Sequence, residues 1–228
     1  MKPPRGTDIA IEAPHGSFGS YLTWPEDEVS AGIVLLQEIF GTNLHIRELA
    51  DQWADAGFAV IVPDLFWRSA PGVQLGYDGA DLDRARAMLA AFDLEAAIDD
   101  TLACADHLRA HGARRVFTIG YCLGGKLAVA AATRPGLDGA VGYYGVGIEK
   151  LGIAGNVKCP VMLHFGAEDP ATPPEATAAL GRQLPAGAEL FCYEGAGHGF
   201  NNWRRPSHDA PAAQRAFARS LTFLRGIA

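Results

Sequence analysis

The sequence predicts an α/β protein with a mostly parallel central sheet and helices on both faces. Short apolar runs alternate with amphipathic stretches from residue 32 to the C-terminus, a pattern typical of a layered sheet with right-handed crossovers. Two of the runs, at residues 33–36 and 59–62, are apolar throughout, as expected for strands that are buried on both faces. In such a sheet the functional side chains gather at the carboxyl ends of the strands.

The individual elements follow from this alternation. Strands are expected over residues 19–24, 32–37, 58–62, 115–120, 139–144, 160–165 and 189–194. Helices are expected over residues 45–56, 81–91, 93–111, 123–133, 174–184 and 207–224. The third helix carries an apolar stripe, and Asp99, Asp100, Asp106 and Arg109 fall mostly outside it. Gly112 is its expected C-cap residue.

The composition suits a globular protein that handles a small molecule. The chain has 228 residues, 49% hydrophobic and 20% charged, so it can bury a full core. It shows neither repeats nor a long charged linker, so a single domain over residues 1–228 is the simpler organisation. Its formal charge of −7 argues against binding to nucleic acid or to an anionic membrane. A small anionic substrate needs only one or two local arginines and is not excluded.

The lack of a membrane span or secretory signal and the spacing of the cysteines predict a cytoplasmic protein. No apolar run reaches the roughly 18 residues of a membrane span, and the basic start lacks the apolar region of a secretory signal. The four cysteines are widely spaced and form no CxxC pair, so neither a disulfide framework nor a zinc ribbon is expected. We expect a monomer or small homo-oligomer that needs no cofactor and no metal.

One cysteine occupies a motif that carries chemistry. The sequence GYCLGG at residues 120–125 joins an expected strand to an expected helix. It has the form of the Gly-x-nucleophile-x-Gly elbow of α/β-hydrolases, with Cys122 in place of serine. Glycines flank the elbow because side chains there would collide with neighbouring backbone, and the helix N-terminus favours a thiolate. The alternative is a buried structural cysteine in a glycine-rich turn.

Two further residues complete a triad in the chain order that this fold requires. Asp169 lies in the loop after the strand at 160–165, where hydrolases place the orienting carboxylate. His198 lies between glycines after the last strand, as a triad base would. Asp169 could instead be an ordinary turn residue before Pro170. Of the other histidines, His45, His107, His111 and His208 are expected to be solvated on helices, and His164 is expected in the core.

The loop after the first buried strand supplies the remaining candidates. Its sequence QEIFG at residues 37–41 follows a strand whose carboxyl end should share an edge with Cys122. The backbone amides of Ile39 and Leu123 are assigned to the oxyanion hole. Glu38 is unusual there, because a carboxylate disfavours a nearby thiolate unless it accepts the thiol proton. It could also be a surface carboxylate before a turn.

Together these residues resemble the dienelactone hydrolase (carboxymethylenebutenolidase) family of α/β-hydrolases. The matching sequences are QEIFG at 37–41, PDL at 63–65, GYCLGG at 120–125, AVGYYG at 140–145 and GAGHGF at 195–200. The resemblance implies that Cys122 rests as a poorly nucleophilic thiol until substrate binding shifts Glu38 to take its proton. The thiolate, paired with His198, then attacks the lactone carbonyl. Asp169 orients His198, which activates the water that hydrolyses the thioacyl-enzyme.

The sequence departs from the family at the arginines that hold the substrate carboxylate. The candidates here are Arg68, Arg84, Arg86 and Arg204. After His198 the expected arginine position holds Asn201 or Asn202, and the first arginine is Arg204. Arg84, Arg86 and Arg204 could equally be solvated surface charges. A small ester or enol-lactone, carboxylate-bearing or not, is therefore the expected substrate class, and dienelactone is the leading example.

Other functions stay open at this stage. The same machinery could act on a different ester or thioester, because the triad reads only the carbonyl group. A non-catalytic ligand-binding scaffold of the same fold, or a redox sensor built on Cys122, is the alternative from another class. The chain has no HxxxH or HExxH pattern, no P-loop and no GxGxxG after the first strand, which argues against metal and nucleotide cofactors.

Overall fold

The computed structural model describes residues 3–13 and 16–227. Its contacts divide the chain into two compact units between Val116 and Phe117. We call residues before this boundary the N-terminal unit and those after it the C-terminal unit, and each is described by itself. The expectation of a single domain stays a prediction.

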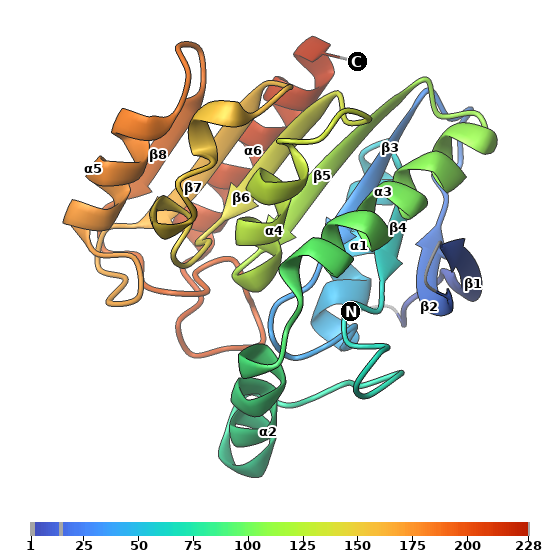
Figure 1. The fold of residues 1–228 in the computed structure, drawn as a ribbon, viewed down its shortest axis with the longest axis horizontal. Coiled ribbons are helices and arrows are strands. Elements are labelled where there is room, and N and C mark those ends of the chain that lie inside the picture. The colour runs from blue at the N-terminus through green and yellow to red at the C-terminus, as the bar shows by residue number, and fades with distance from the viewer. Residues whose placement is uncertain (1–2, 14–15, 228) are drawn as a thin grey trace. The chain divides into compact units, whose positions relative to one another are not determined.

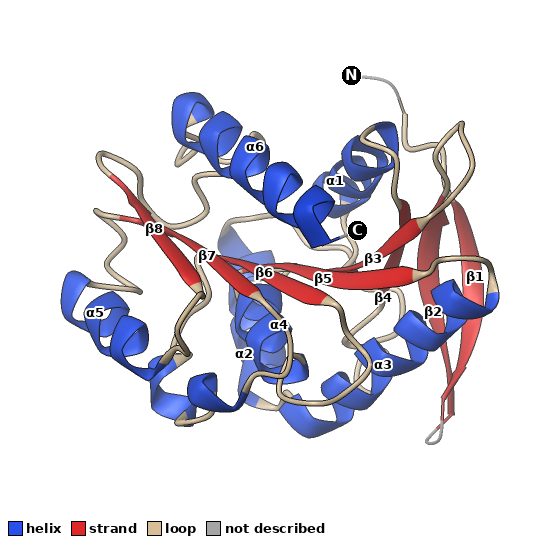
Figure 2. Ribbon diagram, turned by 90° about the horizontal axis from the view of Figure 1, so that it is seen from above, coloured by secondary structure: helices blue, strands red, loops and turns tan. Residues whose placement is uncertain are grey.

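The N-terminal unit is a four-stranded sheet with the strand order β1-β2-β4-β3 (Figure 1). Its strands are β1 (Thr7–Ala13), β2 (Gly16–Thr23), β3 (Ala31–Leu36) and β4 (Ala59–Pro63). Its helices are α1 (Leu44–Asp55), α2 (Gly79–Ala90) and α3 (Leu94–Ala110). β3 and β4 pair in parallel, whereas β1 and β2 are antiparallel to their neighbours. α1 and α3 cover opposite faces of this sheet (Figure 2).

The central strands of this unit are buried, and its helix α3 has defined ends. Every residue of β3 and β4 is buried, which confirms that their unbroken apolar runs pack on both faces. α3 begins where the Asp93 side chain accepts a hydrogen bond from the amide of Ala96. It ends before Gly112, whose φ of 103° suits the expected cap. Asp100 was expected outside the buried stripe, but it is only 1% exposed because it binds partners described below.

The C-terminal unit is built on parallel strands in the order β5-β6-β7-β8. The strands are β5 (Arg115–Tyr121), whose first two residues precede the boundary, β6 (Gly139–Tyr143), β7 (Val161–Gly166) and β8 (Glu189–Tyr193). The helices are α4 (Leu123–Ala131), α5 (Pro174–Gln183) and α6 (Ala210–Ile227), with short 3₁₀ turns η1 (Glu149–Leu151) and η2 (Ala154–Asn156). α4 and α5 lie on one face of the sheet and α6 on the other (Figure 2).

Each expected strand and helix is present in the described residues, with ends that move by a few positions. α6 starts at Ala210 rather than at Ser207, because Asp209 accepts a hydrogen bond from the amide of Ala212 and caps the helix there. β1 and the two 3₁₀ turns were not predicted. No helix in the described part of the chain is long and apolar enough to cross a membrane.

Candidate active site

Cys122 sits at the turn between β5 and α4 with a strained backbone. Its φ is 54° and its ψ is −110°, a conformation that side chains other than glycine rarely adopt. The Cys122 amide donates to the carbonyl of Tyr143, 2.9 Å away, and its carbonyl accepts from the amide of Lys126. These bonds fix the elbow between β6 and the first turn of α4.

The glycines of the elbow are required by close backbone approaches. A Cβ at Gly120 would collide with the carbonyl of Gly124, and one at Gly125 would lie 2.6 Å from the carbonyl oxygen of Tyr143. Both contacts confirm that side chains cannot be accommodated there. Leu123 is the first residue of α4, so its amide has no acceptor within the helix.

His198 connects Cys122 to Asp169. Its Nε2 lies 3.3 Å from the Sγ of Cys122, and its Nδ1 lies 2.7 Å from Oδ2 of Asp169. All three residues belong to the C-terminal unit, at the carboxyl ends of β5, β7 and β8. The structure thus brings together the three side chains that the sequence selected, in the hydrogen-bonded order nucleophile, base and acid.

Asp169 is held as an acceptor on both oxygens. Its Oδ1 accepts from the amide of Ala171 at 2.8 Å, and its Oδ2 accepts from the hydroxyl of Thr172 at 2.9 Å as well as facing His198. Burial raises the pKa of the Asp169 carboxyl, but the bond to His198 and these hydrogen bonds outweigh it, so the pKa lies below its usual value. The residue stays an anion that fixes the orientation of the imidazole.

The pKa of His198 is shifted in the opposite direction. Burial lowers the pKa of the His198 ring, but its hydrogen bonds with Asp169 and Cys122 raise it more, to about 10. The ring therefore retains its second proton near neutral pH. A protonated imidazole at this place can pair with a thiolate and later release its proton to a leaving group.

An aromatic side chain packs against the imidazole, and a second one packs behind it. The ring of Tyr144 meets the ring of His198 edge to face, with centroids 5.2 Å apart, and Phe200 packs on Tyr144 at 5.4 Å. Tyr144 and Phe200 are fully buried, and Tyr144 has a φ of 39°. Tyr144 therefore supports one side of the His198 ring, and Phe200 supports Tyr144.

Glu38 and Ile39 lie in the N-terminal unit, directly after β3. Glu38 is only 1% exposed, so it is not the surface carboxylate that the alternative interpretation described. Ile39 is half-buried. Their roles in proton transfer and oxyanion binding stay predictions.

The candidate arginines have different surroundings. Arg68 donates two hydrogen bonds to the buried carboxylate of Asp100, at 2.6 and 3.0 Å, and stacks over the ring of Trp67 at 4.3 Å. Arg84 on α2 and Arg204 in the loop before α6 are exposed. The environment of Arg68 is that of a structural ion pair, whereas Arg84 and Arg204 are open to solvent.

Two of the remaining histidines differ from expectation. His45 was expected to be solvated, but it is fully buried because it shares the inward face of α1 with Leu49 and Trp53, four and eight residues further along. His208 is exposed but precedes α6 rather than lying on a helix. His164 is buried in β7, as predicted.

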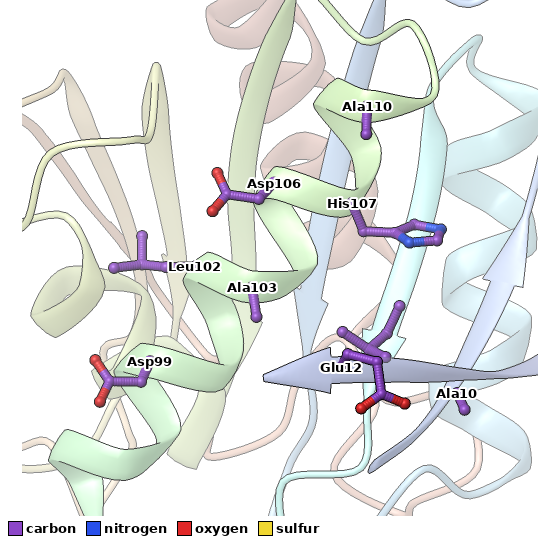
Figure 3. Close-up of a pocket in the computed structure, with 9 residues that line it drawn as sticks. Ala10, Glu12, Asp99, Leu102, Ala103, Asp106, His107 and Ala110 are labelled. Carbon is purple, nitrogen blue, oxygen red and sulfur yellow. The ribbon is translucent and has the colours of Figure 1, made fainter. Parts of the chain in front are cut away.

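An open hollow of about 670 Å³ lies elsewhere, between β1 and α3 of the N-terminal unit (Figure 3). Acidic residues Glu12, Asp99 and Asp106 line it together with His107 and apolar side chains. None of the sequence-predicted site residues contributes to it. Burial and the nearby His111 lower the pKa of His107.

Comparison with known proteins agrees with the geometry. A model of the dienelactone hydrolase family matches residues 18–228. The chain belongs to the dienelactone hydrolase family. Carboxymethylenebutenolidase 1 of Cupriavidus pinatubonensis is 36% identical over 214 residues, which are 92% of each chain. The carboxymethylenebutenolidase of Pseudomonas putida is 36% identical over 223 residues, 95% of this chain and 94% of its own.

A solved structure gives the same family and fold. A Klebsiella pneumoniae protein assigned to the dienelactone hydrolases superimposes with a TM-score of 0.85 and 25% sequence identity. The alignment covers 96% of this chain and 97% of that one. The chain is therefore a hydrolase of ester or lactone bonds with the α/β-hydrolase fold, as its cysteine elbow and strand pattern predicted.

Proposed function

We propose that this dienelactone hydrolase family member opens a small ester or enol-lactone, such as dienelactone to maleylacetate, with Cys122 as nucleophile. The observation that carries the proposal is the hydrogen-bonded series from Cys122 through His198 to Asp169 at a strained strand-to-helix elbow. The curated relatives that match over most of their length are carboxymethylenebutenolidases, which supports a lactone as substrate.

In the proposed reaction the Cys122 sulfur attacks the carbonyl carbon of the lactone. The ring C–O bond breaks, and His198 gives its proton to the departing enolate oxygen, which leaves a thioester on Cys122. The neutral His198 then takes a proton from water as the water attacks that thioester. The C–S bond breaks, the carboxylic acid product leaves, and the thiolate paired with protonated His198 is restored. As the product departs, Glu38 returns its proton to the thiolate, which regenerates the resting thiol.

The first amide of α4, that of Leu123, would stabilise the oxyanion, because it lies at the positive end of the helix dipole. Ile39 is proposed as the second donor on the strength of the QEIFG sequence. Glu38 is proposed to accept the thiol proton when the substrate binds. A Glu38→Gln variant should then slow acylation, measured by stopped-flow absorbance, more than it raises KM, and an unchanged kcat would remove Glu38 from the mechanism.

The substrate is tested by comparing anionic lactones with a neutral ester. We expect cis- or trans-dienelactone, followed by ultraviolet absorbance, to be hydrolysed with a kcat/KM of about 10⁴ M⁻¹s⁻¹ or more and p-nitrophenyl acetate to be a poor substrate. Cys122→Ala should abolish turnover of both while circular dichroism stays unchanged. Substantial turnover by that variant would contradict the nucleophile assignment.

A second candidate function is hydrolysis of a different small ester or thioester. It is favoured by the pairing of Arg68 with Asp100 and by the exposure of Arg84 and Arg204, which leave the binding of a substrate carboxylate without an evident buried arginine. Turnover of p-nitrophenyl acetate with neither dienelactone accepted would select this candidate. Arg84→Gln and Arg204→Gln should raise KM for anionic substrates alone if these residues bind a carboxylate.

A further inference from the structure

A series of hydrogen bonds runs through the interior of the C-terminal unit beneath the triad. His164 of β7, which is fully buried, lies at its centre. Its Nε2 is 2.9 Å from the hydroxyl of Ser220 on α6, and its Nδ1 is 2.9 Å from the hydroxyl of Tyr193 on β8. The Ser220 hydroxyl also meets the hydroxyl of Tyr143 on β6 at 2.8 Å. Three adjacent strands and one helix are thus joined through one imidazole.

The direction of each hydrogen bond follows from an arginine at one end. Arg219 donates to the Tyr193 oxygen at 3.1 Å, and a guanidinium has no acceptor. The single proton of the Tyr193 hydroxyl is therefore free to be donated to Nδ1 of His164. Burial and the charge of Arg219 lower the pKa of His164 to about 3, so the ring is neutral. Its proton must then lie on Nε2 and be donated to Ser220.

His164 and Tyr193 lie near or at the ends of the two strands that precede the loops carrying Asp169 and His198. Tyr193 is the last residue of β8, before the loop that presents His198. β7 ends at Gly166, before the loop that presents Asp169. The two loops are tied by hydrogen bonds from the Ala167 amide to the Tyr193 carbonyl at 2.9 Å and from the Glu168 amide to the Ala196 carbonyl at 3.0 Å.

A second route reaches the imidazole of His198 through the aromatic residues. The backbone carbonyl of His164 accepts a hydrogen bond from the amide of Tyr144 at 2.7 Å, and the ring of Tyr144 packs against that of His198. Phe200, two residues after His198, packs against the rings of Tyr193 and Tyr144. Displacing His164 would therefore change the support of His198 on two sides.

We propose that His164, Tyr193 and Ser220 form a positioning network. This network holds His198 and Asp169 at the positions and orientations in which they can react with Cys122. They are positioning residues, because their polar atoms contact one another and not the three reacting side chains. Directional hydrogen bonds fix one arrangement of the strand ends, whereas the surrounding aromatic packing alone would tolerate small sliding movements. The proposal rests on the function proposed above, in which these three side chains perform the reaction.

Two nearly isosteric substitutions test the network. Tyr193→Phe removes the donor to His164, and Ser220→Ala removes its acceptor. Groups that orient the ligands of metal sites contribute about 10–100-fold to activity; by analogy we expect kcat to fall about tenfold with KM within about twofold. The matched controls are Tyr21→Phe and Ser20→Ala in the N-terminal unit, which also remove buried hydroxyl groups. They should leave kcat within about twofold.

A spectroscopic measurement separates positioning from general stability. In wild-type protein with ¹⁵N-labelled histidine, NMR should show His164 neutral with its proton on Nε2 from about pH 5 to pH 8. Tyr193→Phe should also broaden or shift the low-field Nδ1 proton of His198, which reports its bond to Asp169.

The outcomes are distinguishable from failure of the proposed function. If Cys122→Ala is inactive while folded Tyr193→Phe and Ser220→Ala both keep kcat within about twofold, the network does not position the triad and only this proposal falls. If either variant fails to fold, the wild-type NMR spectrum tests the network through the protonation state and tautomer of His164. A proton on Nδ1 or a charged His164 would overturn the directed network, whereas full activity of Cys122→Ala would overturn the function itself.

Discussion

At Asp169, burial and hydrogen bonding oppose each other, and hydrogen bonding prevails. The carboxylate accepts from His198, Thr172 and the Ala171 amide, which keeps it charged although it is 2% exposed. In the proposed reaction this carboxylate selects the tautomer and orientation of His198. The same contacts make it sensitive to an isosteric change.

Replacing Asp169 with asparagine should therefore remove most activity without unfolding the protein. An amide can present its NH₂ to Nδ1 and favour the wrong tautomer, so we expect kcat to fall about a thousandfold. Thr172→Val, which deletes one of the hydrogen bonds to Asp169, is the matched control and should cost less than about tenfold. Steady-state kinetics on both variants checks this, and equal losses would contradict an orienting role for Asp169.

The elevated pKa of His198 also has a consequence for stability. Folding raises this pKa from 6.5 to about 10, so the folded state binds the proton more tightly. The associated stabilisation is complete below about pH 6.5 and is lost as the pH rises toward about 10. Urea unfolding should show a free-energy difference between wild type and His198→Gln that shrinks over this range. A difference that grows with pH would be inconsistent with a protonated His198.

Arg68 illustrates a residue whose role depends on a partner far away in the sequence. Arg68→Met would remove both hydrogen bonds from the guanidinium to the Asp100 carboxylate, which is 1% exposed, and leave the hydrogen bond from the Trp67 indole. We expect the free energy of unfolding to fall by about 1–3 kcal/mol and the KM ratio of anionic to neutral substrates to stay constant. Arg86→Met, whose partner Asp83 is exposed, should cost less than about 0.5 kcal/mol. A selective rise in KM would assign Arg68 to substrate binding.

The candidate site illustrates what local sequence can and cannot specify. Cys122, Asp169 and His198 were selected because each lies in a short glycine-containing motif after an expected strand. The contact between Arg68 and Asp100 and the bonds of His164 with Ser220 join residues 32 and 56 positions apart. No local pattern encodes such pairs, because they arise only when separate elements pack together.

At the scale of elements, the elbow between β5 and α4 requires that Gly120 carry no side chain. Gly120→Ala would place a methyl group against the Gly124 carbonyl, and we expect it to cost about 2–4 kcal/mol of stability. Gly181→Ala on α5 is the control, because a Cβ there meets open space and should be neutral or stabilise by about 0.5–1 kcal/mol. Chemical denaturation distinguishes them, and equal stabilities would refute the steric argument.

The elements themselves could be predicted where their burial is strong. β3, β4, β6 and β7 are buried along their whole length and appear as unbroken or nearly unbroken apolar runs. β1 was missed because its alternation of Ile9 and Ile11 with Asp8 and Glu12 is short. It pairs only with β2 among the described strands and buries one residue, Ile11, so it lacks the unbroken apolar run that marks the central strands. The 3₁₀ turns η1 and η2 were missed for a related reason, since three residues carry no periodicity.

For the whole molecule, we propose that the two compact units unfold as one domain. The family match extends over residues 18–228 and so includes both units. The alignments with the two carboxymethylenebutenolidases each cover more than nine-tenths of this chain and of the relative. Trp24, Trp53 and Trp67 lie in the N-terminal unit and Trp203 in the C-terminal unit. Urea unfolding followed by tryptophan fluorescence and by far-ultraviolet circular dichroism should therefore give coincident transitions. Two separated transitions would show that the units fold independently.

The central claim is that Cys122 carries the acyl group of the substrate during turnover. The most direct test is intact-protein mass spectrometry of samples quenched with acid during turnover of p-nitrophenyl acetate or dienelactone, followed by peptide mapping. We predict an added mass of one acyl group on the peptide that contains Cys122, absent from Cys122→Ala and accumulating in His198→Gln if deacylation is slowed more than acylation. Full turnover with no adduct at Cys122, or an adduct on another residue, would contradict the thioacyl-enzyme mechanism.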